Sequence, residues 1–451
     1  MNHRYSCHPA LLLVALLVLA SRIPFLGPGY GVDGDGWRVV QAGQHFALTG
    51  EYRYSRQPGY PLQEAVGGLV ADHPYWVGNL FSAAMSVLAV LFFLLILRFY
   101  GVRDQVPGAL ALAFTPVVYI ESTGMMDYVN ALGCLLAATY AVLTGRITLA
   151  GLLVGLAAGF RASSAAMFLP FAAFLLASDR HESRACWRLM QVARLAAVSG
   201  TVTLLLYAEP LATYGAGLFE SYEKVQRPWL PAIWIATVGV FGVPGAAAVA
   251  AGLTQAVLRS SLRTSGETSI PDAPHRADLL LWLSAAAIPV LIFLWQPSES
   301  GYLVPAIPFI LLILARYASR WVFVTTCVAL CVSPWLGQFT PRFGDLVPSM
   351  PGYQAKRVAE MKQIEALWDE LAVRPGRTLV ITAGYAPKLM LTQPEETRSR
   401  VKLISWATAE IITSEQSAGG EVLCFAQACR WNVGRTGTDP IQFGARAFPD
   451  R

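Results

Sequence analysis

The sequence predicts an α-helical polytopic membrane protein of about eleven transmembrane helices, followed by a small C-terminal extracytoplasmic α/β domain. Hydrophobic residues make up 55% of the 451 residues and charged residues only 14%, against about 25% charged residues in soluble proteins. The apolar residues form uncharged blocks near the length of about 20 that crosses a bilayer. After residue 340 the charge density rises again, so a separate domain outside the membrane is expected there.

The candidate spans share uncharged interiors and short charged connections. They are 9–26, 75–97, 106–120, 128–144, 147–160, 163–178, 195–208, 230–258, 279–295, 302–317 and 321–337. The first block follows a short basic lead, so a cleavable signal peptide is the alternative to a permanent helix. Its exit, SRIPFLGPGYG, contains no convincing small-x-small cleavage site, which favours a signal anchor.

Orientation follows from the loops, because Lys and Arg in short loops favour the cytoplasmic side. Five alternate loops carry the arginines. The first has Arg98 and Arg103; the second has Arg146; the third has Arg180, Arg184, Arg188 and Arg194; the fourth has Arg259, Arg263 and Arg276; and the fifth has Arg316 and Arg320. We expect these loops and the N-terminus inside. The loops 31–73, 121–127, 209–229 and 296–301 then lie outside with the tail, although Lys224 and Arg227 weaken the case for 209–229. The net charge of +5 is distributed between spans, so we expect no nucleic-acid partner.

These patterns divide the chain into a membrane module (1–340), a proline-containing linker (341–352) and a small outer domain (353–451). In the outer domain, helical spacing from Val358 predicts a helix that stops at Pro375, and short strands are expected at 378–382, 402–405 and 421–426. Cys424 and Cys429 lie in this domain. Outside the cytoplasm they could form a disulfide or remain two free thiols.

The first outer loop, 31–73, contains the acidic motif Asp33-Gly34-Asp35-Gly36. Apolar and polar residues then alternate at helical spacing, which predicts an amphipathic helix on the membrane surface with both carboxylates at its start. A solvated turn is the simpler interpretation of the motif. Its position at headgroup height favours function, because a general base must reach the acceptor hydroxyl. The two aspartates could also hold a divalent cation, which the sequence does not require.

Three further charged residues adjoin the outer loops. Arg56, beside a Pro-Gly turn in SRQPGY, could bind a phosphate, pair with Asp33 or remain hydrated. Glu121 and Asp127 flank the short loop ESTGMMD. Both are candidate site residues or simple interface charges, and the position of Asp127 directly before an apolar span favours it.

Arg161 and Glu299 lie at the outer ends of apolar segments. Arg161 has uncharged runs on both sides, and a charge placed there is costly unless it is paired. A lipid phosphate is an obvious partner, and a snorkelling interface arginine is the alternative. Glu299, in PSESGYLVPAIPF, has the same character. The lone residues His45 and His73 are typical of interfacial histidines rather than metal ligands.

Four separated motifs carry a family resemblance. The segments DGDGWRVVQAGQHFALTGEYRYSRQPGYPL, ESTGMMD, GLLVGLAAGFRASSAAMFLPF and PSESGYLVPAIPF together resemble the GT-C class of membrane glycosyltransferases, in particular bacterial relatives of the protein O-mannosyltransferases and of the lipid A aminoarabinose transferase. The resemblance implies a GT-C-like membrane fold. It also implies transfer of a sugar from a polyprenyl-phosphate donor, with inversion, to a glycan, lipid or protein acceptor at the outer face of the bacterial cell membrane.

The resemblance also implies roles for individual residues. Asp35 or Asp33 would act as general base, Asp127 matches the acid of the second loop, Arg161 would bind the donor phosphate, and Glu299 matches the acid before the YL-x-P-x-x-P run. Two departures concern the first loop. Gly36 stands where members of the group often have a second acid, and Gln57-Pro58-Gly59 replaces a His- or Lys-Pro-Pro element.

Two other functions compete with a transferase. A transporter or flippase of polyprenyl-linked glycans would need a polar path through the bilayer, and the uncharged spans disfavour it. A non-catalytic envelope scaffold would not require the charged residues at the outer ends of the spans.

Overall fold

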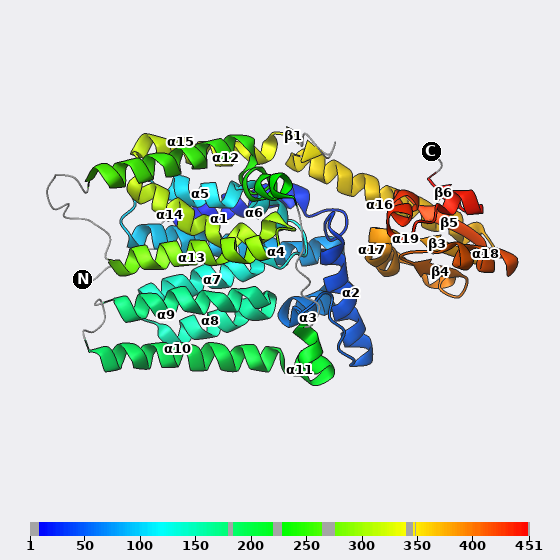
Figure 1. The fold of residues 1–451 in the computed structure, drawn as a ribbon, viewed down its shortest axis with the longest axis horizontal. Helices are drawn as coiled ribbons and strands as arrows, with labels where there is room; N and C mark the ends of the chain where they lie inside the picture. Colours follow the sequence, from blue (N-terminus) through cyan, green and yellow to red (C-terminus); the bar gives the residue numbers. More distant parts are fainter. Residues whose placement is uncertain are drawn as a thin grey trace.

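The computed structural model describes residues 9–178, 184–219, 228–263, 276–339, 346–347 and 349–449. A bundle of long helices forms the membrane part, and the C-terminal domain lies beyond one end of it (Figure 1). The bundle consists of α1 (Pro9–Arg22), α4 (Tyr75–Phe99), α5 (Gln105–Phe114), α6 (Pro116–Glu121), α7 (Tyr128–Leu143), α8 (Ile147–Phe160), α9 (Phe168–Ala177), α10 (Ala185–Leu206), α12 (Trp229–Arg263), α13 (Arg276–Trp295), α14 (Ile307–Tyr317) and α15 (Arg320–Val332).

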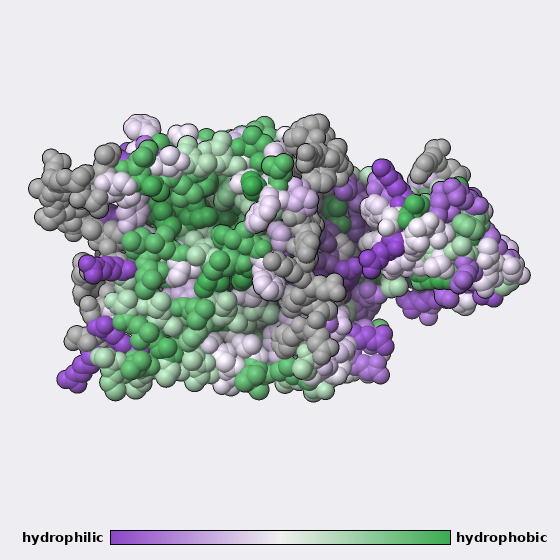
Figure 2. Space-filling model, viewed as in Figure 1, coloured by the Kyte–Doolittle hydropathy of each residue, from purple (hydrophilic) through white to green (hydrophobic). Residues whose placement is uncertain are grey.

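Five stretches are long and apolar enough to cross a membrane: α4, α10, α12, α13 and the run Ser300–Tyr317 that ends with α14. The other apolar helices of the bundle are shorter. Each predicted span overlaps one or two of these helices, so the positions of the apolar segments are confirmed, while the number of crossings stays a prediction. On the face shown in Figure 2, hydrophobic side chains predominate on the bundle, whereas the C-terminal domain carries a mixture with many hydrophilic ones, as expected if lipid surrounds only the bundle.

Two predicted helix boundaries are wrong. The span predicted at 195–208 begins at Ala185, so Arg188 and Arg194 lie on α10 rather than in a loop. Long cationic side chains can extend to the interface while their stems remain in the apolar layer, and a charge therefore did not mark the helix end. The helix predicted from Val358 begins at Met350, where Pro351 occupies the first turn, a position that tolerates a missing N–H.

The loops separate into two groups at opposite ends of the bundle. At one end Arg320 donates to Asp104 at 2.9 Å, which joins two of the loops expected inside. At the other end Arg56 of the 31–73 loop pairs with Asp127 of the 121–127 loop. Each of these two pairs of loops therefore lies at one end of the bundle, while the orientation of the ends in the membrane stays a prediction. Arg180, Lys224 and Arg227, and linker residues 341–345 and 348, lie outside the described residues.

At the outer end, α2 (Gly34–Thr49) and α3 (Pro61–Val70) cross each other, and α11 (Ala208–Tyr214) lies nearby (Figure 1). A Cβ atom on Gly43 would lie 2.0 Å from the carbonyl oxygen of Glu64, so only glycine permits this crossing. The helix expected after the acidic motif is confirmed as α2, while its position on the membrane surface stays a prediction. Its first turns are buried through Trp37 and Val40, whereas Leu48 at the far end is exposed.

The C-terminal domain begins with α16 (Met350–Val373) and contains a four-stranded parallel sheet in the order β4-β3-β5-β6. The strands are β3 (Thr378–Ile381), β4 (Val401–Ile404), β5 (Glu421–Phe425) and β6 (Arg446–Phe448), accompanied by α17 (Ala386–Thr392), α18 (Ala409–Ser417) and α19 (Ala428–Thr436). A short antiparallel pair, β1 (Gln338–Phe339) and β2 (Leu346–Val347), precedes α16. Three strands were predicted, and β6 was too short to recognise. Cys424 and Cys429 are both buried, as thiols rather than as a disulfide.

Candidate active site

The acidic motif forms the N-terminus of α2. Asp33 is the N-cap residue, and its side chain accepts a hydrogen bond of 2.9 Å from the backbone N–H of Asp35. This is the usual capping role of an aspartate, which satisfies a helix donor that has no other partner. Asp35 lies one residue into the helix, where it is 9% exposed, whereas Asp33 is exposed. The motif therefore holds one carboxylate inside the site and one at its rim.

A chain of ion pairs runs inward from Asp35. Arg56 donates to Asp35 at 2.6 Å and to Asp127 at 2.7 Å, and Arg161 donates to the other oxygen of Asp127 at 2.6 Å. The four residues come from α2, the loop before α3, the residue before α7 and the end of α8. Asp127 is completely buried and Arg161 is 4% exposed. Arg161 is therefore a buried, paired arginine and not a snorkelling one.

Aromatic rings surround the two guanidinium groups. The Arg161 guanidinium lies 4.0 Å from the ring centroid of Tyr128 and 4.5 Å from that of Tyr302, and Arg56 lies 4.3 Å from that of Tyr60. Cation–π contacts of this kind offset part of the cost of burying a charge. Burial alone would raise the pKa of Asp127, but the two guanidinium groups outweigh it and hold the pKa below its ordinary value. Asp127 is consequently a carboxylate at neutral pH.

Three further carboxyl groups around this chain bind their protons more tightly than usual. Burial and the nearby charge of Asp33 raise the pKa of Glu121 well above its ordinary value, and its Oε2 has no hydrogen-bond partner among the described residues. Burial also raises the pKa of Glu299, which accepts a hydrogen bond from Tyr128. Desolvation by the surrounding chain and repulsion from Asp35 raise the pKa of Asp33. With these three groups protonated, Asp35 and Asp127 would balance the charges of Arg56 and Arg161.

A divalent cation could bind at the rim. Asp33, Asp35 and Glu299 each offer a carboxylate oxygen, and these atoms lie within 4.8 Å of one another. Carboxylate oxygens are suitable ligands for Mg²⁺ and Ca²⁺. However, the two oxygens of Asp35 already accept from Arg38 at 2.9 Å and from Arg56 at 2.6 Å. A cation would compete with two guanidinium groups for Asp35, so Asp33 and Glu299 are the better ligands.

Glu64 positions the loop that carries Arg56. Its buried carboxylate accepts hydrogen bonds from the Tyr52 hydroxyl at 2.5 Å and from the Ser55 N–H and Oγ at 2.7 Å each. Arg56, the next residue after Ser55, is thereby held close to α3. Sequence reasoning gave Glu64 no role, because a lone glutamate in a polar loop carries no recognisable signal.

The C-terminal domain contacts the acidic motif directly. Lys388 of α17 donates to the carbonyl of Val32 and to Glu360, both at 2.6 Å, and the Val32 N–H donates to the Tyr353 hydroxyl at 3.2 Å. The residue preceding Asp33 is thus fixed by the domain on both sides. No feature of the sequence links segments that are more than 300 residues apart.

The structure brings the predicted residues Asp33, Asp35, Arg56, Asp127, Arg161 and Glu299 together, with Glu121 close enough to interact electrostatically. Arg56 is neither hydrated nor paired with Asp33: it pairs with Asp35 and Asp127, and its binding of a phosphate stays a prediction. Arg38 and Tyr128 were not predicted as site residues. Arg38 follows Asp35 by three residues, which places both on one helix face, and Tyr128 adjoins Asp127; both signals were available.

No protein-family model matches the sequence, and no curated protein sequence is similar to it. Solved structures do match. ArnT from Cupriavidus metallidurans bound to undecaprenyl phosphate is 14% identical with a TM-score of 0.55, and the match covers 97% of this chain and 88% of that one. The same protein in the apo state is 12% identical with a TM-score of 0.52, covering 90% and 87% of the two chains.

Identities this low establish the fold rather than the reaction. The match spans both the membrane part and the C-terminal domain, because almost the whole chain is covered. Together with the apolar helices, it identifies a multi-pass membrane protein. The chain has the GT-C membrane glycosyltransferase fold, the class that its four sequence motifs resemble.

Proposed function

We propose that this chain is a glycosyltransferase that moves a sugar from a polyprenyl-phosphate donor to an acceptor hydroxyl at the outer face of the membrane. The observation that carries the proposal is the chain of ion pairs from Asp35 through Arg56 and Asp127 to Arg161, at the end of a bundle with the GT-C fold. One structure of the similar protein ArnT contains undecaprenyl phosphate, which supports a polyprenyl-phosphate donor.

The arginines provide a binding site for the donor phosphate. Arg56 uses two of its nitrogen atoms on carboxylates, while its buried Nε has no hydrogen-bond partner among the described residues. A buried donor without an acceptor is costly, and an incoming phosphate oxygen would satisfy it. Arg161, together with Arg56, would then offset the charge that develops on the leaving phosphate.

Asp35 is the proposed general base. It would accept the proton of the acceptor hydroxyl while that oxygen bonds to the anomeric carbon of the donor sugar. The bond between this carbon and the phosphate oxygen breaks at the same time, and polyprenyl phosphate leaves with the bonding electrons. Attack opposite the leaving group inverts the anomeric carbon. Arg38 and Arg56 hold the two oxygens of Asp35, so they orient this carboxylate.

The placement in the membrane belongs to the same proposal. The chain crosses the membrane about eleven times, with the N-terminus in the cytoplasm and residues 353–451 outside, in a bacterial cell membrane. Within residues 1–340 the inner loops and the helix ends beside them hold most of the arginines, which supports this orientation. The acceptor is a glycan, a lipid or a protein.

The test is release of free polyprenyl phosphate from a panel of labelled polyprenyl-phosphate sugars by the purified protein, with detergent extracts of the host as acceptor source. We expect one donor to be consumed, and Asp35→Asn to reduce the rate by roughly 100-fold or more, as for loss of a general base. Asp72→Asn, an exposed aspartate of the same outer loop, is the matched control. If no donor reacts although the protein binds the lipid phosphate, a transporter replaces this proposal.

A further inference from the structure

A pocket of about 570 Å³ lies between the first outer loop and the C-terminal domain. One wall is formed by α2 and the segment around Arg53, and the other by α17 and its neighbouring loops. The walls are joined at one point by a contact of 3.1 Å between the Gln41 amide and the Met390 sulfur. The volume is within the range of about 300–1,000 Å³ that is usual for small-molecule sites.

The charged side chains that line the pocket are all basic. They are Arg38, Arg53 and Arg398, with His45 beside them and no aspartate or glutamate among the lining residues. Arg38 pairs with Asp35 at 2.9 Å, and the exposed Glu51 lies 3.6 Å from Arg53 and 3.7 Å from His45. Arg398 has no ion-pair partner in the part of the chain that the structure describes. The positive charge of the pocket is therefore only partly compensated.

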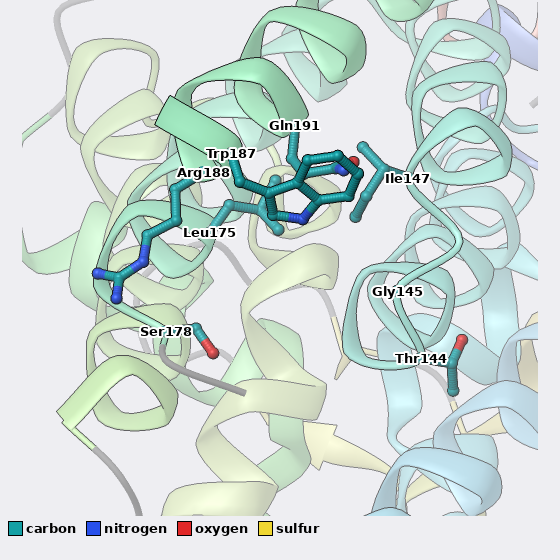
Figure 3. Close-up of a pocket in the computed structure, with 8 residues that line it drawn as sticks. All are labelled: Thr144, Gly145, Ile147, Leu175, Ser178, Trp187, Arg188 and Gln191. Carbon is teal, nitrogen blue, oxygen red and sulfur yellow. The ribbon is translucent and has the colours of Figure 1, made fainter. Parts of the chain in front are cut away.

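A pocket at the other end of the bundle shows that this charge is a local feature. It has a volume of about 320 Å³ and is lined by residues of the α7–α8 turn, the end of α9 and the start of α10 (Figure 3). Arg188 is its one charged lining residue, and this side chain donates to the carbonyl of Leu176 at 3.1 Å.

The basic pocket opens beside the proposed base. Arg38 lines the pocket and also donates to Asp35 at 2.9 Å, so the pocket and the reacting carboxylate share one side chain. A ligand bound against Arg38 is therefore separated from Asp35 by one side chain. Gln41, Gln44, Ser55 and Ser405 also line the pocket and provide hydrogen-bonding groups suited to sugar hydroxyls.

We infer that this pocket binds the acceptor, and that the acceptor is a sugar that carries an anionic group, phosphate or carboxylate. The inference rests on the proposed transferase function and specifies its acceptor class. Arg53 and Arg398 bind the anionic group, because guanidinium groups form charge-assisted hydrogen bonds with planar or tetrahedral oxyanions. The sugar ring then lies toward Arg38 and Asp35.

Equilibrium binding to the full chain in nanodiscs, without any donor, tests this inference. The probes are α-D-glucose 1-phosphate, D-glucuronate, methyl α-D-glucoside and inorganic phosphate. We expect one of the two anionic sugars to bind at least roughly 10-fold more tightly than the neutral glucoside, as for one charge-assisted contact. Which of the two binds distinguishes phosphate from carboxylate as the anionic group.

The double variant Arg53→Gln/Arg398→Gln should lose this preference, with binding of the anionic sugar weakened by roughly 10-fold or more. Both side chains are exposed, so the fold should tolerate the change. Arg435→Gln, an exposed arginine on α19 of the same domain, removes a charge elsewhere and should leave binding unchanged.

Three results would overturn the inference. They are equal binding of charged and neutral sugars, binding of inorganic phosphate as tight as that of the sugar phosphate, and a loss of binding in Arg435→Gln as large as that in the double variant. The assay contains no polyprenyl donor, so its failure is separate from the failure of the transferase proposal. Donor consumption with no preference for anionic sugars would reject the acceptor class alone.

Discussion

Buried arginines occur at two places at the outer end of the bundle, Arg357 at one and Arg56 with Arg161 at the other, and the two places differ in the groups that the guanidinium N–H donors contact. Arg357 of α16 uses all five of its N–H donors on main-chain carbonyls, at distances from 2.7 to 3.0 Å. Its acceptors are Phe25, Gly27, Pro28, Gly29 and Thr123. Arg56 and Arg161 instead pair with the carboxylates of the candidate site, and the Nε of Arg56 has no partner among the described residues.

The difference separates a structural contact from a binding site. Every donor of Arg357 is satisfied within the protein, so this cluster fixes α16 to the 25–29 loop and has no capacity left for a ligand. The candidate site retains an unsatisfied donor at Arg56 and an unsatisfied carboxyl oxygen at Glu121. Unsatisfied buried groups are costly for folding, and a ligand that pairs with them recovers that cost.

The largest expected effect is the loss of transfer activity when Arg161 of the candidate site is replaced. Arg161→Ala should reduce transfer by roughly 100- to 1,000-fold, because it removes a cation aimed at charge that develops during reaction. Arg161→Lys keeps the charge but not the planar geometry, so it should recover only part of the activity. The measurement is release of polyprenyl phosphate, with Arg146→Ala at the opposite end of the bundle as control. Full activity in Arg161→Ala would remove this residue from the donor site.

Arg357→Met should act on stability instead. Loss of five hydrogen bonds from one buried guanidinium should lower the free energy of unfolding by roughly 3 kcal/mol, measured as a lower Tm in detergent. Lys362→Met, an exposed residue of the same helix, should leave Tm unchanged. Activity per folded molecule should fall far less than in Arg161→Ala. A variant with unchanged Tm and lost activity would place Arg357 in the catalytic machinery and abolish the distinction.

The smallest effect concerns Glu121 and its dependence on pH. Burial raises its pKa in the folded state, so the fold holds the proton more tightly than the unfolded chain does. Its contribution to stability is therefore complete below the ordinary glutamate pKa of 4.5 and is lost as the pH rises from there toward the folded-state pKa.

Glu121→Gln mimics the protonated form and should remove this loss. We expect the variant and the wild type to have similar Tm values at pH 5, and the variant to have the higher Tm at pH 8. Glu51→Gln, an exposed glutamate, should show no such difference. A variant less stable than the wild type at pH 8 would mean that Glu121 is ionised and paired.

The sequence predicted those parts of the fold that depend on local pattern. Apolar blocks located the bundle helices, and the spacing after Asp35 located α2, because burial and helix capping act within a few residues. The predicted first residues of α10 and α16 were wrong, because the predictions placed Arg194 and Pro351 outside the helices although both residues are compatible with a helix.

The candidate site divides in the same way. Outer-loop charges such as Asp127 and Arg161 stood out because an unpaired charge beside an apolar span is costly. Their mutual pairing depends on how α7 and α8 pack, which no local pattern encodes. Lys388 and Tyr353 gave no signal at all, since their partner is the backbone of Val32, and backbone groups are the same in every sequence.

The Arg357 contact also has a consequence for biosynthesis. Arg357 and its acceptor at Phe25 are 332 residues apart, so at typical translation rates roughly 20 to 60 s separate their emergence. During that interval the carbonyls of the 25–29 loop must be hydrated or bound by another protein. A chain released before α16 is made would expose these carbonyls, together with the backbone groups of Val32 that Lys388 and Tyr353 bind in the mature chain.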